Sequence, residues 1–279
     1  MRSQLGAGKD ASAHQIEYRL TVGRSEQASK AAVITVNYHS APLIHGLEQR
    51  LATVAECKLY VVDNSGEFRA SRQDTNVIVS PANIGFGRAC NLGVRSSVEP
   101  ILLFINPDLE IDPETLSSLV TDAPAEPDAI WSPLIEDRNG QCSALVETSG
   151  LLPLERLSFP RSDAEHHKSV YISGACLCIR RSFFTRLGGF REDIFLYAED
   201  LDLCRRATAL GGKLIVLAAL IARHVGGRSS SRIAPRIHRL RRSFRGHLRF
   251  VRTHFPGLLS PVLAFYLATG RRRTIGSQK

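Results

Sequence analysis

The chain has 279 residues, of which 43% are hydrophobic and 23% charged, values that are ordinary for a soluble globular protein with one large domain or two small ones. No stretch reaches the roughly 18 to 20 apolar residues of a membrane-spanning helix, and the start, MRSQLGAGKDASAH, lacks the apolar segment of a secretory signal. The net charge of +9 is uneven, because Asp202 is the last acidic residue and 17 of the 36 Lys and Arg follow it. Such a basic segment favours anionic partners: nucleic acid, anionic lipid or a phosphorylated substrate.

The first half of the chain predicts alternating strands and helices. Residues 1–30 are expected to form a flexible tail. Apolar, β-branched or helical patterns follow in the order strand 31–37, helix 42–55, strand 58–63, strand 76–80, helix 86–97 and strand 101–105. This alternation predicts an α/β fold with a mostly parallel sheet covered by helices on both faces.

The second half is less regular. Residues 122–169 are rich in Pro, Asp, Glu and Ser and predict loops and short antiparallel strands. The elements expected after them are strand 171–180, helix 181–187, helix 199–210, strand 213–217 and two basic helices over 235–254 and 260–269. We therefore expect a main domain over 31–230 and a basic helical extension over 231–279.

Polar residues follow four predicted strands, at the point where each strand ends. They are Asn37-Tyr38, Asp63-Asn64, Pro81 to Asn83 and Asn106 to Asp108. Ligands of such sheets bind beyond the carboxyl ends of the strands. The break in LLFINPDLEID is therefore either an ordinary polar loop or a site for a metal or a phosphate, and four polar ends on one edge favour the site.

The segment NIGFGRACNLG, residues 83–93, is rich in glycine but fits no standard phosphate loop. Cys90 stands where the dinucleotide motif G-x-G-x-x-G requires its third glycine, and no Gly-Lys-Ser/Thr is present. Taken alone, the segment is equally well explained as a tight loop that begins a helix.

The segment FLYAEDLDLCRR, residues 195–206, places Glu199, Asp200 and Asp202 in the first turn of a helix. Acids there stabilise the helix dipole, which is one explanation. A carboxylate partly desolvated by the preceding aromatic residues could instead act as a catalytic base. His224, after the last strand and beside glycines, is either structural or a ligand.

These segments resemble, in order, the inverting family 2 glycosyltransferases with the GT-A fold, and especially the rhamnosyltransferase-like branch. The matching pieces are VITVNYHS, VVDNSG, NIGFGRACNLGV, LLFINPDLEI, SGACLCIRRSFFTRLGGFRE, FLYAEDLDLCRRATALG and ARHVGGRSS, spread over residues 31–250. The resemblance implies a Rossmann-like α/β/α sandwich with C-terminal basic helices. It also implies transfer of a sugar, L-rhamnose from dTDP-rhamnose, to a glycan or lipid-linked acceptor in cell-surface polysaccharide synthesis, in the cytoplasm at the inner face of the membrane.

The resemblance also implies site residues for a nucleotide-sugar donor. Those matched to the nucleoside are Tyr38, Asp63, Asn64, Asn83, Arg88 and Asn91, with Asp63 accepting a hydrogen bond from the base. Asn106-Pro107-Asp108 matches the Asp-x-Asp metal motif, with Asn in place of its first acid. Asp108 and His224 would hold Mg²⁺ or Mn²⁺ against the diphosphate.

The resemblance also implies residues for catalysis and for contact with the donor sugar and the acceptor. Asp200 matches the general base that takes the proton of the acceptor hydroxyl. Gly174 and Ala175 would line the donor sugar and acceptor, and Glu199 would orient the base or contact the acceptor. Two departures weaken the acceptor side of the match, since Arg191 stands where an acid is frequent and Ala198 where an aromatic residue is frequent.

Two alternative functions remain at this point. A basic nucleic-acid-binding protein would explain the tail, but the tail has few aromatic residues for base stacking and the sheet edge is acidic. A nucleotidyltransferase would share the sheet and acidic metal ligands. It would need a Gly-rich loop with Arg or Lys after the first strand, and residues 38–42 provide none. We therefore expect no nucleic-acid partner.

Overall fold

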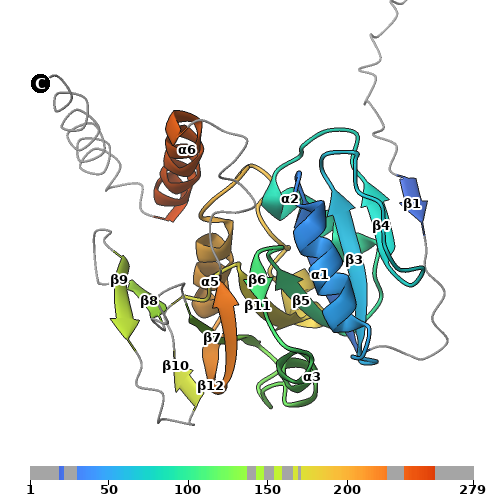
Figure 1. Cartoon of the computed structure of the whole chain (residues 1–279). Coiled ribbons are helices and arrows are strands. Elements are labelled where there is room, and N and C mark those ends of the chain that lie inside the picture. The colour runs from blue at the N-terminus through green and yellow to red at the C-terminus, as the bar shows by residue number, and fades with distance from the viewer. Residues whose placement is uncertain are drawn as a thin grey trace, which may run out of the picture.

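The computed structural model describes residues 19–21, 30–136, 143–147, 154–158, 166–168, 171–224 and 236–254. In this part of the chain, a ten-stranded sheet has the order β1-β4-β3-β2-β5-β11-β7-β12-β10, with β6 paired to β12 (Figure 1). The strands are β1 (Arg19–Thr21), β2 (Ala31–Asn37), β3 (Cys57–Asp63), β4 (Asn76–Val79), β5 (Ile101–Ile105), β6 (Leu109–Glu110), β7 (Ala129–Glu136), β10 (His166–Lys168), β11 (Cys176–Arg180) and β12 (Lys213–His224). A separate pair joins β8 (Ser143–Glu147) to β9 (Leu154–Ser158).

The parallel part of the sheet was predictable from its apolar segments. Strands β4, β3, β2 and β5 are parallel neighbours, and β2 and β5 begin and end where the sequence predicts. Every residue of β2 is buried, as expected of a strand covered on both faces. The carboxyl ends of these strands therefore meet at one edge, which confirms the expected clustering of their polar ends.

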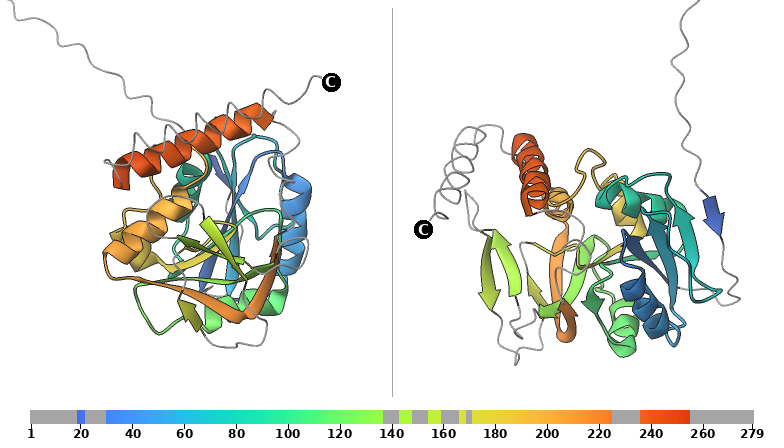
Figure 2. Two further views of the ribbon diagram at one scale, coloured as in Figure 1. Left: turned by 90° about the vertical axis from the view of Figure 1, so that its left-hand side faces the viewer. Right: turned by 45° about the horizontal axis from the view of Figure 1, so that its top comes forward.

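Helices cover both faces of the sheet (Figure 2). One core lies under α1 (Ala41–Leu51) and α3 (Pro113–Thr121) and includes Val33, Val61 and Leu103. The other lies under α2 (Phe86–Arg95), α4 (Arg181–Arg186) and α5 (Glu199–Ala209) and includes Ile34, Val62 and Phe104. Neighbouring strand residues alternate between the two cores, so the predicted α/β/α sandwich is confirmed.

Several predicted boundaries were wrong. Residues 19–21 pair with β4 as the edge strand β1, inside the segment expected to be a tail. Strand β7 falls within 122–169 but is a buried inner strand, antiparallel to β11 and parallel to β12. Strand β12 continues beyond residue 217 to His224 because its second half pairs with β7 and β6 across an irregularity in register. Such pairing is set by distant segments and leaves no local signal.

The predicted boundary at residue 231 does not separate two domains in the described structure. Helix α6 (Arg236–His254) lies against α5, and its Phe250 and Val251 are buried in the same core as α2 and α5. The second predicted helix, 260–269, lies outside the described residues. No helix of the described chain has the length and apolarity needed to cross a membrane.

Helix α2 packs very closely on the sheet at Gly93. A Cβ atom at this position would lie 2.7 Å from Cγ2 of Ile34 and 3.3 Å from Cγ2 of Val62, distances that a packed core does not tolerate without displacement. Gly46 in α1 offers a contrast, because the nearest atom to a Cβ there is Arg50 Nη1 at 3.4 Å, at the end of a long side chain.

We predict that Gly93→Ala destabilises the fold by about 1–3 kcal/mol, since overpacking outweighs the gain in helix propensity. The matched change Gly46→Ala should leave stability unchanged or raise it by up to about 1 kcal/mol. Urea unfolding of both variants measures the difference. Equal stability of the two variants would contradict the close packing of α2.

Candidate functional site

The carboxyl ends of β2 and β3 are joined by a buried polar network. Asn37 Nδ2 donates to Asp63 Oδ1 at 2.8 Å and to Ser65 Oγ at 2.9 Å, and Asn37 Oδ1 accepts from Ser40 N at 2.9 Å. The Asn64 backbone N–H also donates to the carbonyl of Asn37 at 2.9 Å. These bonds fix the loops that follow both strands relative to each other.

Asp63 is placed differently from what the sequence suggested. Asp63 is 0% exposed. Its carboxylate accepts hydrogen bonds from Ser65 N and Oγ, from Phe68 N and from Asn37 Nδ2. Burial alone would raise its pKa, but the hydrogen bonds from Ser65, Phe68 and Asn37 lower it below the usual value. The charged carboxylate therefore positions the loop, and no surface of it is open to a nucleoside base in this structure.

Asn64, the next residue, uses only the nitrogen of its side-chain amide in hydrogen bonds to the described residues. Its Nδ2 donates to Asn83 Oδ1 at 3.3 Å and to the Gly85 carbonyl at 3.2 Å. Both partners are acceptors, which fixes the orientation of the amide. Its Oδ1 is buried and has no hydrogen-bond partner among the described residues, a costly arrangement unless a ligand donates to it. Tyr38 lies nearby on the surface, with its ring 4.6 Å from that of His39.

Arg88 and Asn91 hold a neighbouring loop. Asn91 Nδ2 donates to the Phe190 carbonyl at 2.8 Å, and Asn91 Oδ1 accepts from Phe190 N at 2.9 Å. Arg88 Nε donates to Glu192 Oε2 at 3.1 Å in an exposed ion pair. Both side chains thus fix residues 190–192 against α2, a role that the glycine-rich pattern did not predict.

The turn after β5 brings together the residues predicted to hold a metal. Asp108 is 4% exposed, and its Oδ1 lies 3.3 Å from His224 Nε2, although 116 residues separate the two in sequence. The pairing of β6 with the end of β12 places them together. Pro107 and Asp108 also line a small cavity of about 120 Å³. No group of three or more His, Cys, Asp or Glu suited to a metal occurs in the described chain.

A larger pocket of about 290 Å³ unites the end of β5 with the start of α5. Its lining includes six of the predicted site residues: Asn106, Gly174, Ala175, Glu199, Asp200 and His224. The Asn106 N–H donates to the Ala175 carbonyl at 3.0 Å, so the turn after β5 is bonded directly to the segment before β11. The six predicted residues come from four separate parts of the chain.

Asp200 is held in this pocket from one side. Its Oδ2 accepts from Gly174 N at 2.8 Å and from the hydroxyl of Tyr171, while Oδ1 accepts from Leu201 N at 2.8 Å. A Cβ atom at residue 174 would lie 3.1 Å from Oδ2, so a larger residue there would crowd the carboxylate. Burial and the charge of Asp200 raise the pKa of Tyr171 well above its usual value, and the phenol remains a donor.

Glu199, the neighbour of Asp200, is buried in the same pocket. Burial, and then the neighbouring Asp200 carboxylate, raise the pKa of Glu199 to about 8. Its Oε2 is buried and has no hydrogen-bond partner among the described residues. At neutral pH Glu199 is therefore a carboxylic acid that can donate a hydrogen bond into the pocket.

Eight residues that line this pocket were not among the predicted site residues. They include Phe86, Tyr171 and His247, and also Tyr197, which the sequence indicated only as an aromatic neighbour of the acids. Tyr171 stood at the start of a predicted strand and gave a weak signal. His247 gave none, because α6 appeared to be a separate extension.

Comparison with known proteins identifies the fold and the family of this chain. The chain matches the model of Glycosyl transferase family 2 over residues 47–188, half of its length, and that of Glycosyl transferase family group 2 over residues 156–275. A mannosyltransferase from Pyrobaculum calidifontis, in complex with GDP-Man and Mn²⁺, superposes with a TM-score of 0.54 at 15% identity, covering 86% of this chain and 69% of that one. GalNAc-T7 with UDP, GalNAc and Mn²⁺ superposes with a TM-score of 0.57 at 15% identity, covering 72% and 44%. These likenesses show that the fold is GT-A.

Two curated relatives are more similar in sequence. The low-salt glycan biosynthesis hexosyltransferase of Haloferax volcanii is 33% identical over 192 residues, covering 63% of this chain and 61% of the relative. The N-acetylglucosaminyl-diphospho-decaprenol L-rhamnosyltransferase of Mycobacterium tuberculosis is 27% identical over 217 residues, covering 64% of this chain and 70% of the relative. The chain thus spans less than two thirds of the length of the first of them. The ordered sequence motifs, the GT-A fold and the matched family model together show that this chain belongs to glycosyl transferase family 2, on its rhamnosyltransferase-like branch.

Proposed function

We propose that the protein is an inverting glycosyltransferase that moves a sugar, L-rhamnose from dTDP-rhamnose, to a hydroxyl of a glycan or lipid-linked acceptor in cell-surface polysaccharide synthesis. The observation that carries the proposal is the single pocket that Asn106 and His224 share with Asp200. A group that could activate a hydroxyl then lies in the same cavity as residues that could hold a diphosphate and its cation. The mycobacterial relative, whose name specifies rhamnosyl transfer to a lipid diphosphate sugar, supports the choice of substrates.

Asp108 and His224 are the proposed ligands of a divalent cation, Mg²⁺ or Mn²⁺. A carboxylate and an imidazole 3.3 Å apart fit part of its coordination shell, and diphosphate oxygens and water would complete it. When bound, the cation neutralises charge on the leaving diphosphate. With two protein ligands, we expect weak cation binding unless the donor is present.

Asn64 is the proposed acceptor of a hydrogen bond from the nucleoside base, because its buried Oδ1 has no partner among the described residues. This assignment replaces Asp63, whose four hydrogen bonds already satisfy its carboxylate. Tyr38 and Asn83, on the loops beside Asn64, are the remaining candidates for contact with the nucleoside.

Asp200 is the proposed general base. Tyr171 and Gly174 fix its Oδ2, and Oδ1 has only the backbone N–H of Leu201 as a partner in the described chain. Oδ1 is therefore the oxygen that takes the proton of the acceptor hydroxyl as that hydroxyl attacks the anomeric carbon. Neutral Glu199 donates to a sugar hydroxyl in the same pocket. It also avoids a second negative charge beside the base.

We predict that the purified protein, given a panel of dTDP-rhamnose, UDP-glucose, UDP-N-acetylglucosamine and GDP-mannose, releases nucleoside diphosphate fastest from dTDP-rhamnose. The acceptor probe is N-acetylglucosamine linked to octyl diphosphate. Release should need Mg²⁺ or Mn²⁺.

Asp200→Asn should lower transfer roughly 10²–10⁴-fold, because the amide cannot take a proton, while dTDP binding measured by calorimetry stays unchanged.

Asp122→Asn is the matched control, since Asp122 is exposed at the end of α3 and should transfer like the wild type. Absence of turnover with every donor would refute the proposed function. Turnover by Asp200→Asn at the wild-type rate would instead refute the assignment of the base.

Glu199 gives a prediction about pH. Its pKa of about 8 in the folded protein exceeds the ordinary value of 4.5, so between these values the folded state keeps a proton that the unfolded state has lost. Stability therefore falls as pH rises through this window, with a slope of up to about 1.4 kcal/mol per pH unit. Glu199→Gln cannot titrate and should lose less stability than the wild type between pH 5 and 8. Urea unfolding at several pH values tests this, with the exposed Glu114→Gln as control, and parallel profiles would contradict it.

We also propose that residues beyond α6 contact the inner face of an anionic membrane. Residues 260–269 are apolar and precede Arg271 to Arg273, a composition suited to an interfacial segment. The full chain should float with vesicles that contain anionic lipid and not with neutral ones. A chain that ends at His254 keeps the buried Phe250 and Val251 and should float with neither. Equal flotation of the two chains would exclude this surface.

A further inference from the structure

Helix α6 lies beside α5 (Figures 1 and 2). Phe250 and Val251 are 2% and 4% exposed and belong to the core shared with α2 and α5. One turn earlier, His247 lines the pocket that contains Asp200 and Glu199. The helix therefore contributes both to the core and to the wall of the candidate site.

Gly246 permits this close approach. A Cβ atom there would lie 2.1 Å from the carbonyl oxygen of Tyr197 and 2.8 Å from that of Leu196. Both contacts are with backbone, which cannot move aside as a flexible side chain can. Tyr197 and Ala198 have φ angles of 68° and 74°, an uncommon conformation for residues with a side chain and typical of functional segments. Backbone contact with Gly246 brings His247 to the pocket beside this segment.

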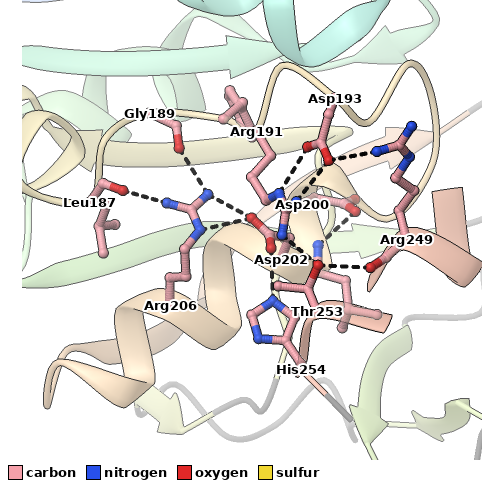
Figure 3. Close-up of polar contacts among 12 residues, drawn as sticks. Leu187, Gly189, Arg191, Asp193, Asp200, Asp202, Arg206, Arg249, Thr253 and His254 are labelled. Carbon is pink, nitrogen blue, oxygen red and sulfur yellow. Dashed lines mark hydrogen bonds and ion pairs between the residues drawn. The ribbon is translucent and has the colours of Figure 1, made fainter. Parts of the chain in front are cut away.

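A hydrogen bond between His254 and Asp202 holds α6 on the first turn of α5 (Figure 3). Asp202, whose side chain is 0% exposed, accepts from His254 Nε2 at 2.7 Å and from Arg206 Nε at 2.8 Å. Buried carboxylates with two such partners are held firmly. Asp202 follows Asp200 by two residues, so the same turn presents Asp200 to the pocket and Asp202 to α6.

A second part of the anchor lies on the loop before α5. Arg191 donates to Asp193 at 2.9 and 2.7 Å and to Thr253 Oγ1 at 2.6 Å, and Arg249 Nη1 donates to Asp193 Oδ2 at 3.0 Å. At position 191 this chain has Arg, where the family resemblance leads us to expect an acid. The hydrogen bond from Arg191 to Thr253 on α6 gives a physical reason for this difference. The α6 anchor, defined as Arg191, Asp193, Asp202, Arg206, Arg249, Thr253 and His254, thus fixes the helix at two levels.

We infer that α6 forms one wall of the acceptor site and that His247 hydrogen-bonds the acceptor glycan. This inference rests on the proposed function. The acceptor hydroxyl must approach Asp200 from the side opposite the leaving diphosphate, and the proposed diphosphate corner is built by the ends of β5 and β12. His247 and the Tyr197 backbone belong instead to α6 and the loop before α5. An imidazole can both donate to and accept from sugar hydroxyls, so His247 is a positioning residue for the acceptor.

The test compares four variants of the full chain: His247→Ala, His247→Gln, Arg249→Ala and Arg252→Ala. Arg252 matches Arg249 in charge and in being exposed on α6, but it lies outside the α6 anchor. Binding of the octyl-diphosphate N-acetylglucosamine probe is measured by saturation-transfer NMR, which needs no turnover. Donor affinity is measured by calorimetry with dTDP, and thermal unfolding checks that each variant folds.

His247→Ala should weaken probe binding about tenfold and raise the acceptor KM by more than it lowers kcat, with dTDP affinity unchanged. His247→Gln should recover part of the loss because its amide keeps hydrogen-bonding groups. Arg249→Ala should weaken probe binding in the same direction, and Arg252→Ala should behave as the wild type. Equal probe binding by wild type and His247→Ala, or no binding by either, would overturn the inference. A wild-type chain that turns over no sugar nucleotide would overturn the proposed function instead.

Discussion

The first turn of α5 is the part of the structure on which the rest of the site depends. It is held by Tyr171 and Gly174 through Asp200 on one side and by Arg206 and His254 through Asp202 on the other. The turn begins from Ala198, which has a left-handed conformation and provides no side-chain cap. Bonds from Tyr171, Gly174 and His254, which lie outside the helix, and from Arg206 within it therefore fix a helix start that its own cap does not.

The acidic side chains of this turn lie in different environments. Three acids fall within four residues, yet each has a different environment. Burial and the neighbouring charge keep Glu199 protonated near neutral pH. Asp200 accepts two hydrogen bonds at Oδ2 and one at Oδ1. Asp202 pairs with Arg206 and accepts a hydrogen bond from His254. Side chains crowded at one helix end can thus have separate chemical roles because their solvation and partners differ.

The sequence predicted the sheet and the grouping of the strand-end residues well, because buried parallel strands and polar loops have strong local patterns. It also predicted that Asp108 and His224 would meet, on the basis of resemblance alone. It did not predict the hydrogen bonds that Asp63 and Asn91 make within the protein, and the contact of these two residues with a nucleoside stays a prediction. It failed most for α6, since the pairs Asp202–His254 and Arg191–Thr253 span more than fifty residues and leave no periodic signal.

Gly246 and its contact with residues 196–197 have a consequence for the order in which the site is made. Ribosomes deliver the strand ends and α5 before α6, so the nascent sheet can form while one wall of the pocket that Asp200 lines is still absent. That wall is completed only when the helix arrives and its glycine meets the backbone of Tyr197. Substitutions in this late segment can therefore change one wall of the pocket and leave the earlier strand ends intact.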